Sequence, residues 1–386
     1  MRMPVVVYIL GLTIFSLTTS EFMVAGMMPS LTQAFGVSVT QIGYLISFYA
    51  IGMVIGGPVL TVGLLKLRVS NKKALLCLLL LYALAQAVAA ASNSYDIMAG
   101  ARFVTGVAAA ACFGASLAIC GEVVAVGSRA RAASIVVGGL MLANVVGVPA
   151  ATLIDQYWGW RASFWLVVML VAVCSLLIIF MVPRSHAAAA PSLDAELAEF
   201  KKPALWAAYL TSGLIIGAAF AAFSYFAPIL TEVTGFGAAA IPWLLALYGV
   251  ANVIGNMVIG RYADKYTFPI LGWGLAGLAT ALAVFALFAQ NQIISVLALI
   301  VVGLIGVALN PAMISRILKV AHPGALVHTM HSSVINMGLG LGSWLGGLGI
   351  AAGYGLRSPL WLGFALAMAG LLSVLPYLKS VPRRAP

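Results

Sequence analysis

Residues 162–182 read ASFWLVVMLVAVCSLLIIFMV, a run of 21 residues without a charged side chain. A bilayer core about 30 Å thick is crossed by roughly 20 apolar residues in helical form, because each residue adds about 1.5 Å. Strands of a membrane barrel alternate apolar and polar residues over about ten positions, whereas this run is longer and apolar on all faces. The run therefore predicts a membrane-spanning α-helix.

Similar runs recur along the chain. Hydrophobic residues make up 63% of the 386 residues and charged residues 8%, whereas about a quarter of a soluble domain is charged. The sequence predicts an all-α integral membrane protein with twelve transmembrane helices in two pseudo-symmetric six-helix bundles. The predicted helices cover residues 4–28, 41–64, 74–92, 97–120, 132–154, 162–182, 204–229, 240–261, 268–289, 292–315, 328–350 and 359–378.

The net charge of +11 indicates topology and not nucleic-acid binding. Seventeen of the 20 Lys and Arg residues fall on one side of the membrane if the amino terminus lies there, while Arg161 and Arg357 fall on the other. Asp96, Asp155 and Glu232 accompany those two in the opposite loops. Because cytoplasmic loops carry an excess of basic residues, both termini are predicted to be cytoplasmic. A lipid bilayer is then the expected surrounding of the chain.

The longest polar interval separates two halves. The predicted domains are residues 1–183 and 204–386, joined by a cytoplasmic linker over 184–203. GLLKLRVSNKK (63–73) follows the second predicted helix and GRYADKY (260–266) follows the eighth, so equivalent places carry a Gly and then basic residues. Two six-helix halves in parallel repeat, with a cavity near the midplane, form a recurring plan for secondary transporters.

The first predicted helix contains a single carboxylate, Glu21, near its outer end. A charged residue at the centre of a helix costs about 2.5 to 3.5 kcal/mol on insertion scales, so such residues usually face water or a partner. A carboxyl group that binds a proton in one state and releases it in the other can couple transport to a proton gradient. We expect this role for Glu21; the alternative is a structural acid that stays charged.

Arg102 lies about six residues into the fourth predicted helix, which enters the membrane from the outer side. Glu21 lies near the outer end of the first predicted helix, so the two residues are at roughly the same depth. Arginine keeps its proton at any accessible pH. Its expected role is to stabilise the deprotonated form of Glu21. The alternative is an arginine that reaches the lipid headgroups.

Polar side chains form stripes on two predicted helices of the second half. The spacing of four places Tyr248, Asn252 and Asn256 on one face, and His328, Ser332 and Asn336 on another. One face of each helix then contacts water or forms hydrogen bonds to a neighbouring helix. Buried amides also join helices in this way without lining a cavity. With aromatic rings that can stack on a planar ligand, the predicted cavity residues are Phe223, Tyr225, Tyr248, Asn252, Asn256, Ser332 and Asn336. His331 is expected to be solvated near a helix end.

The chain resembles the twelve-helix drug:proton antiporter branch of the major facilitator superfamily, which includes bacterial sugar-, purine- and chloramphenicol-efflux pumps. The likeness rests on SEFMVAGMMP (20–29), RFVTG (102–106), NVVGVPAATLIDQYWGWRASFW (144–165) and FSYFAPIL (223–230). It implies that Glu21 and Arg102, which lie in the first two of these motifs, take part in proton handling.

The resemblance also assigns roles to a helix and two loops. The family's antiporter motif corresponds to Asn144, Gly147 and Pro149, although Val148 interrupts the usual Gly-Pro pair; the motif is expected to hold the halves together and limit leak. The family's loop after the second helix reads G-x-L-A-D-R-x-G-R-K, and here Leu67 replaces its aspartate. The predicted gating-loop residues are Gly63, Arg68, Lys72, Gly260, Asp264 and Lys265.

Several motifs are absent from the sequence. It has no G-x-x-x-x-G-K-[ST] run for ATP, no metal-type Cys/His spacing and no G-x-S-x-G nucleophile motif. We therefore expect no enzyme activity, no cofactor and no metal, and we expect transport energy to come from an ion gradient.

The sequence thus predicts proton-coupled efflux of a small organic molecule (a drug, a sugar or a related amphiphile) by alternating access across the bacterial inner membrane. The alternative is a proton-coupled importer of a sugar or small metabolite. Importers typically carry several membrane carboxylates, so the single Glu21 in the first half favours export. The expected partners are the substrate, protons and lipid, and a monomer is the habit of the family; the substrate itself stays open.

Overall fold

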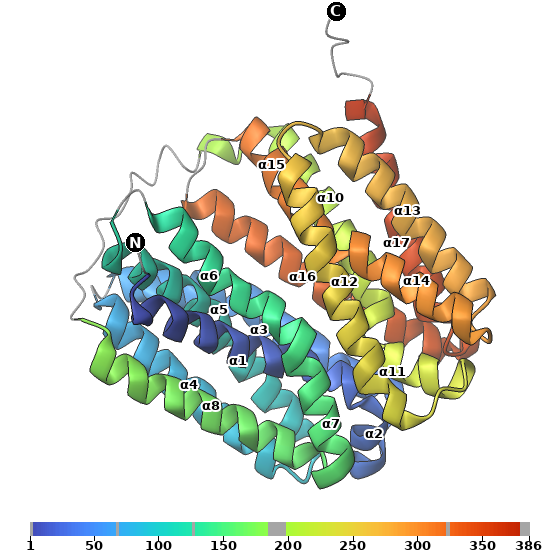
Figure 1. The fold of residues 1–386 in the computed structure, drawn as a ribbon, viewed down its shortest axis with the longest axis horizontal. Helices are drawn as coiled ribbons and strands as arrows, with labels where there is room; N and C mark the ends of the chain where they lie inside the picture. Colours follow the sequence, from blue (N-terminus) through green and yellow to red (C-terminus); the bar gives the residue numbers. More distant parts are fainter. Residues whose placement is uncertain (1–2, 67–68, 126–127, 184–197, 322–324, 379–386) are drawn as a thin grey trace, which may run out of the picture. The chain divides into compact units, whose positions relative to one another are not determined.

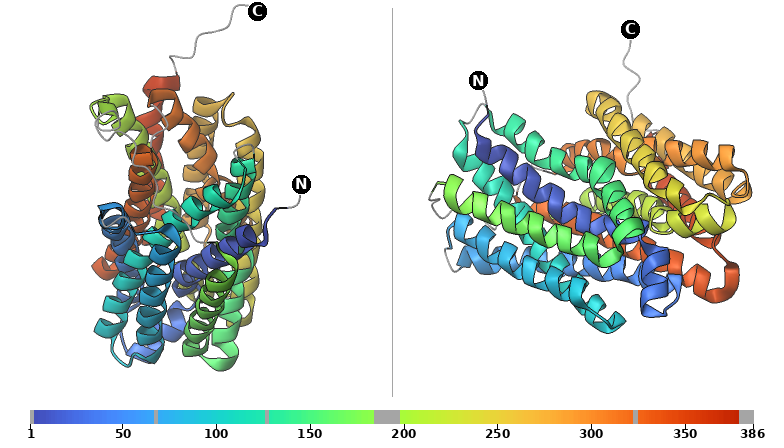
Figure 2. Two further views of the ribbon diagram at one scale, coloured as in Figure 1. Left: turned by 90° about the vertical axis from the view of Figure 1, so that its left-hand side faces the viewer. Right: turned by 60° about the horizontal axis from the view of Figure 1, so that its bottom comes forward.

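The computed structural model describes residues 3–66, 69–125, 128–183, 198–321 and 325–378. Within these ranges twelve helices are long and apolar enough to cross a membrane, which confirms the predicted all-helical fold. The chain forms two compact units, Met1–Pro191 with Gly237–Ala246 and Ser192–Phe236 with Leu247–Pro386. Figures 1 and 2 show the helices of each unit lying alongside one another.

The first unit is built around its first helix. It contains α1 (Val5–Gly26), α2 (Met28–Phe35), α3 (Val39–Lys66), α4 (Asn71–Ala91), α5 (Tyr95–Val123), α6 (Arg129–Leu142), the π-helical turn η2 (Ala143–Gly147), α7 (Val148–Trp158) and α8 (Trp160–Met181). Helix α1 contacts α3, α5, α6, α7 and α8, so it is the most buried of the candidate spans. Polar side chains on α1 therefore lie inside protein and not in lipid.

The second unit is organised around α10 (Pro203–Phe223), which packs against α15, α16 and α17. The short α11 (Phe226–Pro228) and the π-helical turn η3 (Ile229–Val233) follow α10. The 3₁₀ turn η4 (Ala238–Ala240) and the start of α12 (Ile241–Tyr262), as far as Ala246, belong to the first unit, and the rest of α12 belongs to the second. The remaining elements are α13 (Thr267–Leu287), α14 (Gln292–Ile305), the 3₁₀ turn η5 (Val307–Leu309), α15 (Asn310–Val320), α16 (Ala325–Gly349), the π-helical turn η6 (Ile350–Tyr354) and α17 (Ser358–Leu378).

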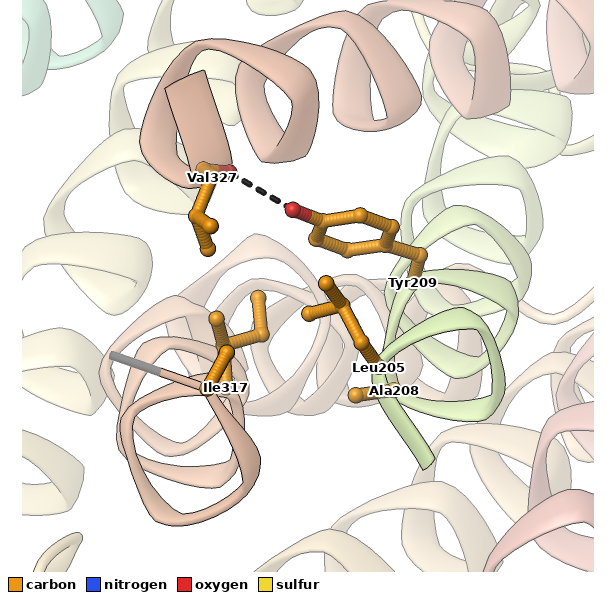
Figure 3. Close-up of a cluster of buried hydrophobic side chains, with 6 residues drawn as sticks. Leu205, Ala208, Tyr209, Ile317 and Val327 are labelled. Atoms are coloured by element: carbon orange, nitrogen blue, oxygen red, sulfur yellow. Dashed lines mark hydrogen bonds between the residues drawn. The ribbon is translucent and has the colours of Figure 1, made fainter. Parts of the chain in front are cut away.

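Part of the second unit's core joins α10, α15 and α16. Leu205, Ala208, Tyr209, Ile317 and Val327 are all buried there. The Tyr209 hydroxyl donates to the main-chain oxygen of Val327 at 2.7 Å, as Figure 3 shows. A polar tip thus finds a partner within an apolar cluster, as a buried tyrosine requires.

Glycines bring α3 and α5 into backbone contact. A Cβ atom on Gly106 would collide with the main-chain oxygen of Tyr49, and one on Gly52 would collide with that of Phe103. Lipid tails are as apolar as the side chains, so the hydrophobic effect does not drive helix association inside a membrane. Membrane helices rely instead on close van der Waals packing between small residues. These glycines therefore fix the distance between the two helices.

The second unit repeats this contact between α12 and α14. A Cβ atom on Gly303 would lie 2.8 Å from the main-chain oxygen of Tyr248, and one on Gly255 would collide with that of Leu304. In both units a tyrosine carbonyl on the unit's second membrane-spanning helix thus faces a glycine on its fourth.

Two predicted helix ends differ most from the structure. The run predicted as one helix over 204–229 breaks after Phe223, because Pro228 has no N–H with which to continue the helical ladder. The helix predicted to stop at residue 315 continues in α15 to Val320. Arg316, a basic residue directly after the predicted end, is not in a loop but lies inside the protein with 2% of its surface exposed.

Asp155 was expected in a loop, and this expectation is also wrong. It lies in the last turn of α7, is 6% exposed, and its Oδ2 atom accepts a hydrogen bond of 2.6 Å from the Ser30 hydroxyl on α2. The turn to α8 is made by Gly159 alone, whose φ of 81° is the left-handed conformation that glycine tolerates best. Because α7 and α8 are joined by this single residue, Asp155 stays inside the last turn of α7 and not in an exposed loop.

Candidate functional site

Glu21 lies inside the first unit. It is 7% exposed, within a buried polar stretch of α1 that runs from Thr18 to Glu21. The hydroxyls of Thr13, Ser16 and Thr19 donate to main-chain oxygens four residues earlier, so they are satisfied within the helix. Among the residues that the structure describes, no hydrogen bond or ion pair reaches the Glu21 carboxylate.

Arg102 of α5 is completely buried, with 0% of its surface exposed, so it does not reach the headgroups. Its Nη1 atom donates to the main-chain oxygen of Ser20 at 2.8 Å, and its Nη2 atom donates to that of Glu21 at 2.9 Å. Its Nε atom lies 3.5 Å from the main-chain oxygen of Leu45 on α3. The structure therefore brings Arg102 to Glu21, but through main-chain oxygens and not through the carboxylate.

Two tyrosines complete the surroundings of Arg102. The guanidinium carbon lies 4.3 Å from the ring centre of Tyr49, within the range of a cation–π interaction. The hydroxyls of Tyr49 and of Tyr82 on α4 point to the main-chain oxygen of Leu17, at 3.4 and 3.5 Å. Four helices of the first unit thus converge on one buried polar cluster.

Gln86 on α4 links this cluster to Ser20. The Ser20 hydroxyl donates to Gln86 Oε1 at 3.0 Å and receives a long bond of 3.3 Å from Arg102 Nη1. Gln86 Nε2 is buried without a hydrogen-bond partner among the residues that the structure describes. The sequence pattern did not predict roles for Ser20, Tyr49, Tyr82 and Gln86, although a lone amide in the apolar run of α4 was a signal for Gln86.

The predicted antiporter motif lies where α6 turns into α7. Pro149 cannot donate a main-chain hydrogen bond, and the π-helical turn η2 stands directly before it, with Val148 N donating to Ala143 O. A Cβ atom on Gly147 would collide with the Thr19 hydroxyl of α1. The half-buried Asn144 donates to the main-chain oxygen of Leu140 at 3.2 Å.

In the second unit, the predicted cavity aromatics form a ring cluster. The rings of Phe223 and Tyr248 lie 5.0 Å apart, and Phe226 lies 5.9 Å from Phe223 and 5.6 Å from Tyr248. The Tyr225 hydroxyl points elsewhere and donates to the main-chain oxygen of Ser343 at 2.9 Å. Phe223, Tyr225 and Tyr248 are all buried.

The amides of the two predicted polar stripes differ in their partners. Asn252 on α12 is buried, and its side chain makes no hydrogen bond within the described part of the chain. Asn256 is half-buried. On α16, Asn336 is buried and donates to the main-chain oxygen of Ser332 at 2.9 Å, while Ser332 itself is exposed.

His331 was expected to be solvated, and this is wrong. It is 4% exposed, its Nε2 atom lies 3.1 Å from the Ser212 hydroxyl, and its ring stacks on Tyr209 with centres 6.0 Å apart. The neighbouring His328 is exposed. The two residues lie three positions apart on α16, and no local sequence pattern indicates that α10 covers the position of His331.

The predicted gating loop of the second half is tied to α15. Asp264 accepts a hydrogen bond of 2.5 Å from the Ser315 hydroxyl, and Lys319 Nζ donates to the main-chain oxygen of Asp264 at 3.0 Å. The exposed Lys265 lies 5.0 Å from the ring centre of Tyr266, and Gly260 is in the last turn of α12.

The first-half loop is only partly described. Gly63 is in α3, and Lys72, at the start of α4, donates to the main-chain oxygens of Ile179 and Val182 at 2.8 and 2.5 Å. Arg68 and Leu67 lie outside the described residues, as does most of the predicted linker. In the described ranges, no group of three or more His, Cys, Asp or Glu side chains is placed to hold a metal ion.

Within the described ranges, twelve helices long and apolar enough to cross a membrane, with an acid and an arginine buried among them, are the features of a multi-pass membrane protein. Comparison with known proteins agrees: the family model for the Major Facilitator Superfamily matches residues 10–335. The chain belongs to the major facilitator superfamily, whose members are transporters and not enzymes.

Curated relatives match over nearly the whole chain. A chloramphenicol resistance protein of Streptomyces lividans is 29% identical over 389 residues, covering 100% of this chain and 99% of the relative. Inner membrane transport protein YdhP of Escherichia coli K12 is 31% identical over 367 residues, covering 95% and 94%. A bacterial homologue of the human lysosomal transporter Spinster, solved inward-facing and occupied, has a TM-score of 0.77 at 15% identity, with 97% of both chains covered, which concerns the fold alone.

Proposed function

We propose that this protein exports small organic molecules across the bacterial inner membrane in exchange for protons. The observation that carries the proposal is the buried Glu21 carboxylate, which has no hydrogen-bond or ion-pair partner within the described residues. A permanently charged structural acid would be expected to hold such partners, because an unpaired buried charge is costly. A carboxyl group that is neutral in one state and charged in another needs no permanent partner.

Arg102 supports this role by its charge and not by a direct bond. Its Nη1 and Nη2 atoms bond main-chain oxygens of α1, and its Nε atom faces Leu45 O, so the guanidinium is fixed beside Glu21. A fixed positive charge favours the deprotonated carboxylate over the neutral acid. In the proposed cycle, Arg102 therefore stabilises the state of Glu21 that has released its proton.

We place substrate binding in the second unit. The Phe223 and Tyr248 rings offer apolar surface for an aromatic or amphiphilic molecule, and Asn252 offers an amide without an internal partner in the described chain. The relative that is a chloramphenicol resistance protein makes chloramphenicol the first compound to test. A sugar and a purine are the next.

Proteoliposomes test the proposal, because the sign of the pH gradient separates antiport from symport. Vesicles with an acidic lumen should accumulate radiolabelled chloramphenicol as protons leave, whatever the orientation of the protein. An importer that moves protons and substrate together would accumulate the compound only when the outside is acidic. Gradient-driven uptake should disappear in Glu21→Gln.

Glu232→Gln is the matched control, because Glu232 is an exposed carboxylate on η3. It should transport like the wild type. The proposal fails if Glu21→Gln retains full gradient-driven accumulation. It also fails if none of the three compound classes accumulates in wild-type vesicles with an acidic lumen.

We also propose that both termini face the cytoplasm, from the distribution of Lys and Arg. A carboxyl-terminal fluorescent protein, which folds only in the cytoplasm, should fluoresce in cells. A periplasmic reporter fused at the same place should be inactive, and the reverse pattern would reject this topology.

A further inference from the structure

A second buried cation lies in the second unit, apart from the residues of the proposed proton site. Arg316 is on α15, four residues before Val320, where a candidate membrane span ends. It is 2% exposed. An ionisable residue in a membrane span is a functional-site candidate by default, because burying its charge is costly unless a partner offsets it.

The partners of Arg316 are all neutral. Its Nη1 atom donates to the Thr211 hydroxyl of α10 at 2.6 Å, and its guanidinium carbon lies 4.7 Å from the ring centre of Tyr377 and 5.8 Å from that of Phe268. The Tyr377 hydroxyl also interacts with the guanidinium, whereas the Nη2 atom is buried and has no hydrogen-bond partner in the described part of the chain. The N–H groups of Nη2 are thus the donors of Arg316 that the described residues leave unpaired.

None of the acidic side chains described in the second unit forms an ion pair with Arg316. Glu199 pairs with Lys202 at 2.8 Å, Asp264 accepts from Ser315, and Glu232 is exposed on η3. No ion pair to Arg316 occurs among the described residues. Two linker acids, Asp194 and Glu196, lie outside them.

The surroundings add a second cation and further hydroxyls. Lys319, three residues along the same face of α15, lies 5.9 Å from the Phe268 ring centre and donates to the Thr267 hydroxyl at 2.7 Å, a neutral partner. Thr211 Oγ1 lies 2.7 Å from the Ser373 hydroxyl of α17. Positive charge and hydroxyl groups from α10, α15 and α17 therefore gather at one end of the unit, without a described counter-ion at Arg316.

We propose that Arg316 is an oxyanion-binding site, which takes a carboxylate or phosphate group on its unpaired Nη2 edge. A planar guanidinium binds such groups through two parallel hydrogen bonds, with the Nη1 and Nη2 atoms side by side. The anion supplies the negative charge that the described residues lack. Its source is either a soluble anion, including an acidic group of a substrate, or the phosphate of an anionic lipid headgroup.

Inorganic sulfate is the probe for the soluble source. In neutral detergent at constant ionic strength, replacing chloride by sulfate should raise the apparent Tm of the wild type with a saturating dependence on sulfate. Arg316→Gln should abolish this rise in Tm. Arg316→Lys should raise the half-saturating sulfate concentration about tenfold, because an ammonium group cannot form the two parallel hydrogen bonds of a guanidinium. Arg261→Gln, which removes an exposed cation from α12, should respond like the wild type.

A second arm tests the lipid source. Nanodiscs of phosphatidylcholine with and without phosphatidylglycerol, free of sulfate, should differ in Tm for the wild type and not for Arg316→Gln if the phosphate of an anionic headgroup occupies the site, because the choline ammonium offsets the phosphate charge of phosphatidylcholine. Both arms are repeated in Asp194→Asn/Glu196→Gln, which removes the linker carboxylates as competing anions. If Arg316→Gln does not fold, the comparison of wild type with Arg316→Lys decides.

The proposal is overturned if neither sulfate nor phosphatidylglycerol stabilises the wild type or the linker variant. It is also overturned if Arg316→Gln, or in its place Arg316→Lys, keeps the full effect. These outcomes do not depend on Glu21 or on transport, so they leave the proposed antiport untouched.

Discussion

At the scale of single residues, Arg102 holds three helices together. Its donors reach main-chain oxygens at Ser20 and Glu21 on α1 and at Leu45 on α3, while the residue itself belongs to α5. Those oxygens lie where the backbone fixes them. A change at Arg102 should therefore affect the stability of the first unit as well as the charge beside Glu21.

We expect Arg102→Lys to lower stability by about 1.5 to 3 kcal/mol, since a lysine ammonium cannot span the same oxygens and at least one charged hydrogen bond is lost. The apparent Tm in detergent, followed by tryptophan fluorescence, should fall by several degrees. Arg161→Lys is the matched control: Arg161 is exposed and bonds Ser92 O and Asn93 Oδ1 on the surface. Equal Tm values for the two variants would contradict the clamping role of Arg102.

Charged residues at membrane depth could be predicted from the sequence, and neutral ones could not. Glu21 and Arg102 stand out because ionised groups in lipid are costly. Ser20 and Tyr49 are as buried as Arg102, yet serine and tyrosine occur in many membrane helices without any special role. Only the packing of α1 against α3, α4 and α5 reveals that they share a cluster.

At the scale of helices, contacts between backbones set the geometry of the proton site. Tyr49, whose ring lies over Arg102, presents its main-chain oxygen to Gly106, one turn along α5 from Arg102. The contact between α3 and α5 thus positions both Tyr49 and Arg102 in the buried polar cluster.

Gly106→Ala should lower the apparent Tm and reduce transport, because its Cβ atom would collide with the main chain of α3, which cannot move aside cheaply. Gly114→Ala, on the same helix, meets nothing within 4 Å of its new Cβ atom. It should be neutral or stabilising by about 0.5 to 1 kcal/mol, since alanine is the better helix former. Similar Tm values for the two variants would show that the α3–α5 contact does not limit stability.

Helix number and type could be predicted because apolar length decides both. Helix ends and breaks could not be predicted where tertiary packing decides them: Arg316 suggested a loop but lies inside α15, and Asp155 suggested a loop but lies inside α7. In each case a polar residue is covered by other helices, and no local pattern records that cover.

At the scale of the whole molecule, the two units use one helical plan with different side chains. The first helix of each unit faces a glycine at the matching place: Thr19 faces Gly147, and the main-chain oxygen of Ala221 lies 3.0 Å from a Cβ on Gly346. Two residues further along, the first unit has Glu21 and the second has Phe223. Charge thus occupies this position in one unit and an aromatic ring in the other.

This difference predicts separate effects on substrate and proton. Phe223→Ala should raise the KM for the transported compound about tenfold, the equivalent of roughly 1.4 kcal/mol of lost ring contact, while the dependence on the pH gradient stays. Trp273→Ala removes an aromatic ring that is 80% exposed on α13 and should change neither. Loss of gradient dependence in Phe223→Ala, with KM unchanged, would contradict the division of roles.

The most direct measurement of the central claim is proton release on substrate binding. Purified protein in weakly buffered solution with a pH indicator receives a saturating amount of the compound that accumulates in acid-loaded vesicles. The wild type should release protons, since in antiport substrate and proton exclude one another, and Glu21→Gln should bind the compound and release none. Equal proton release by the two proteins would contradict the account.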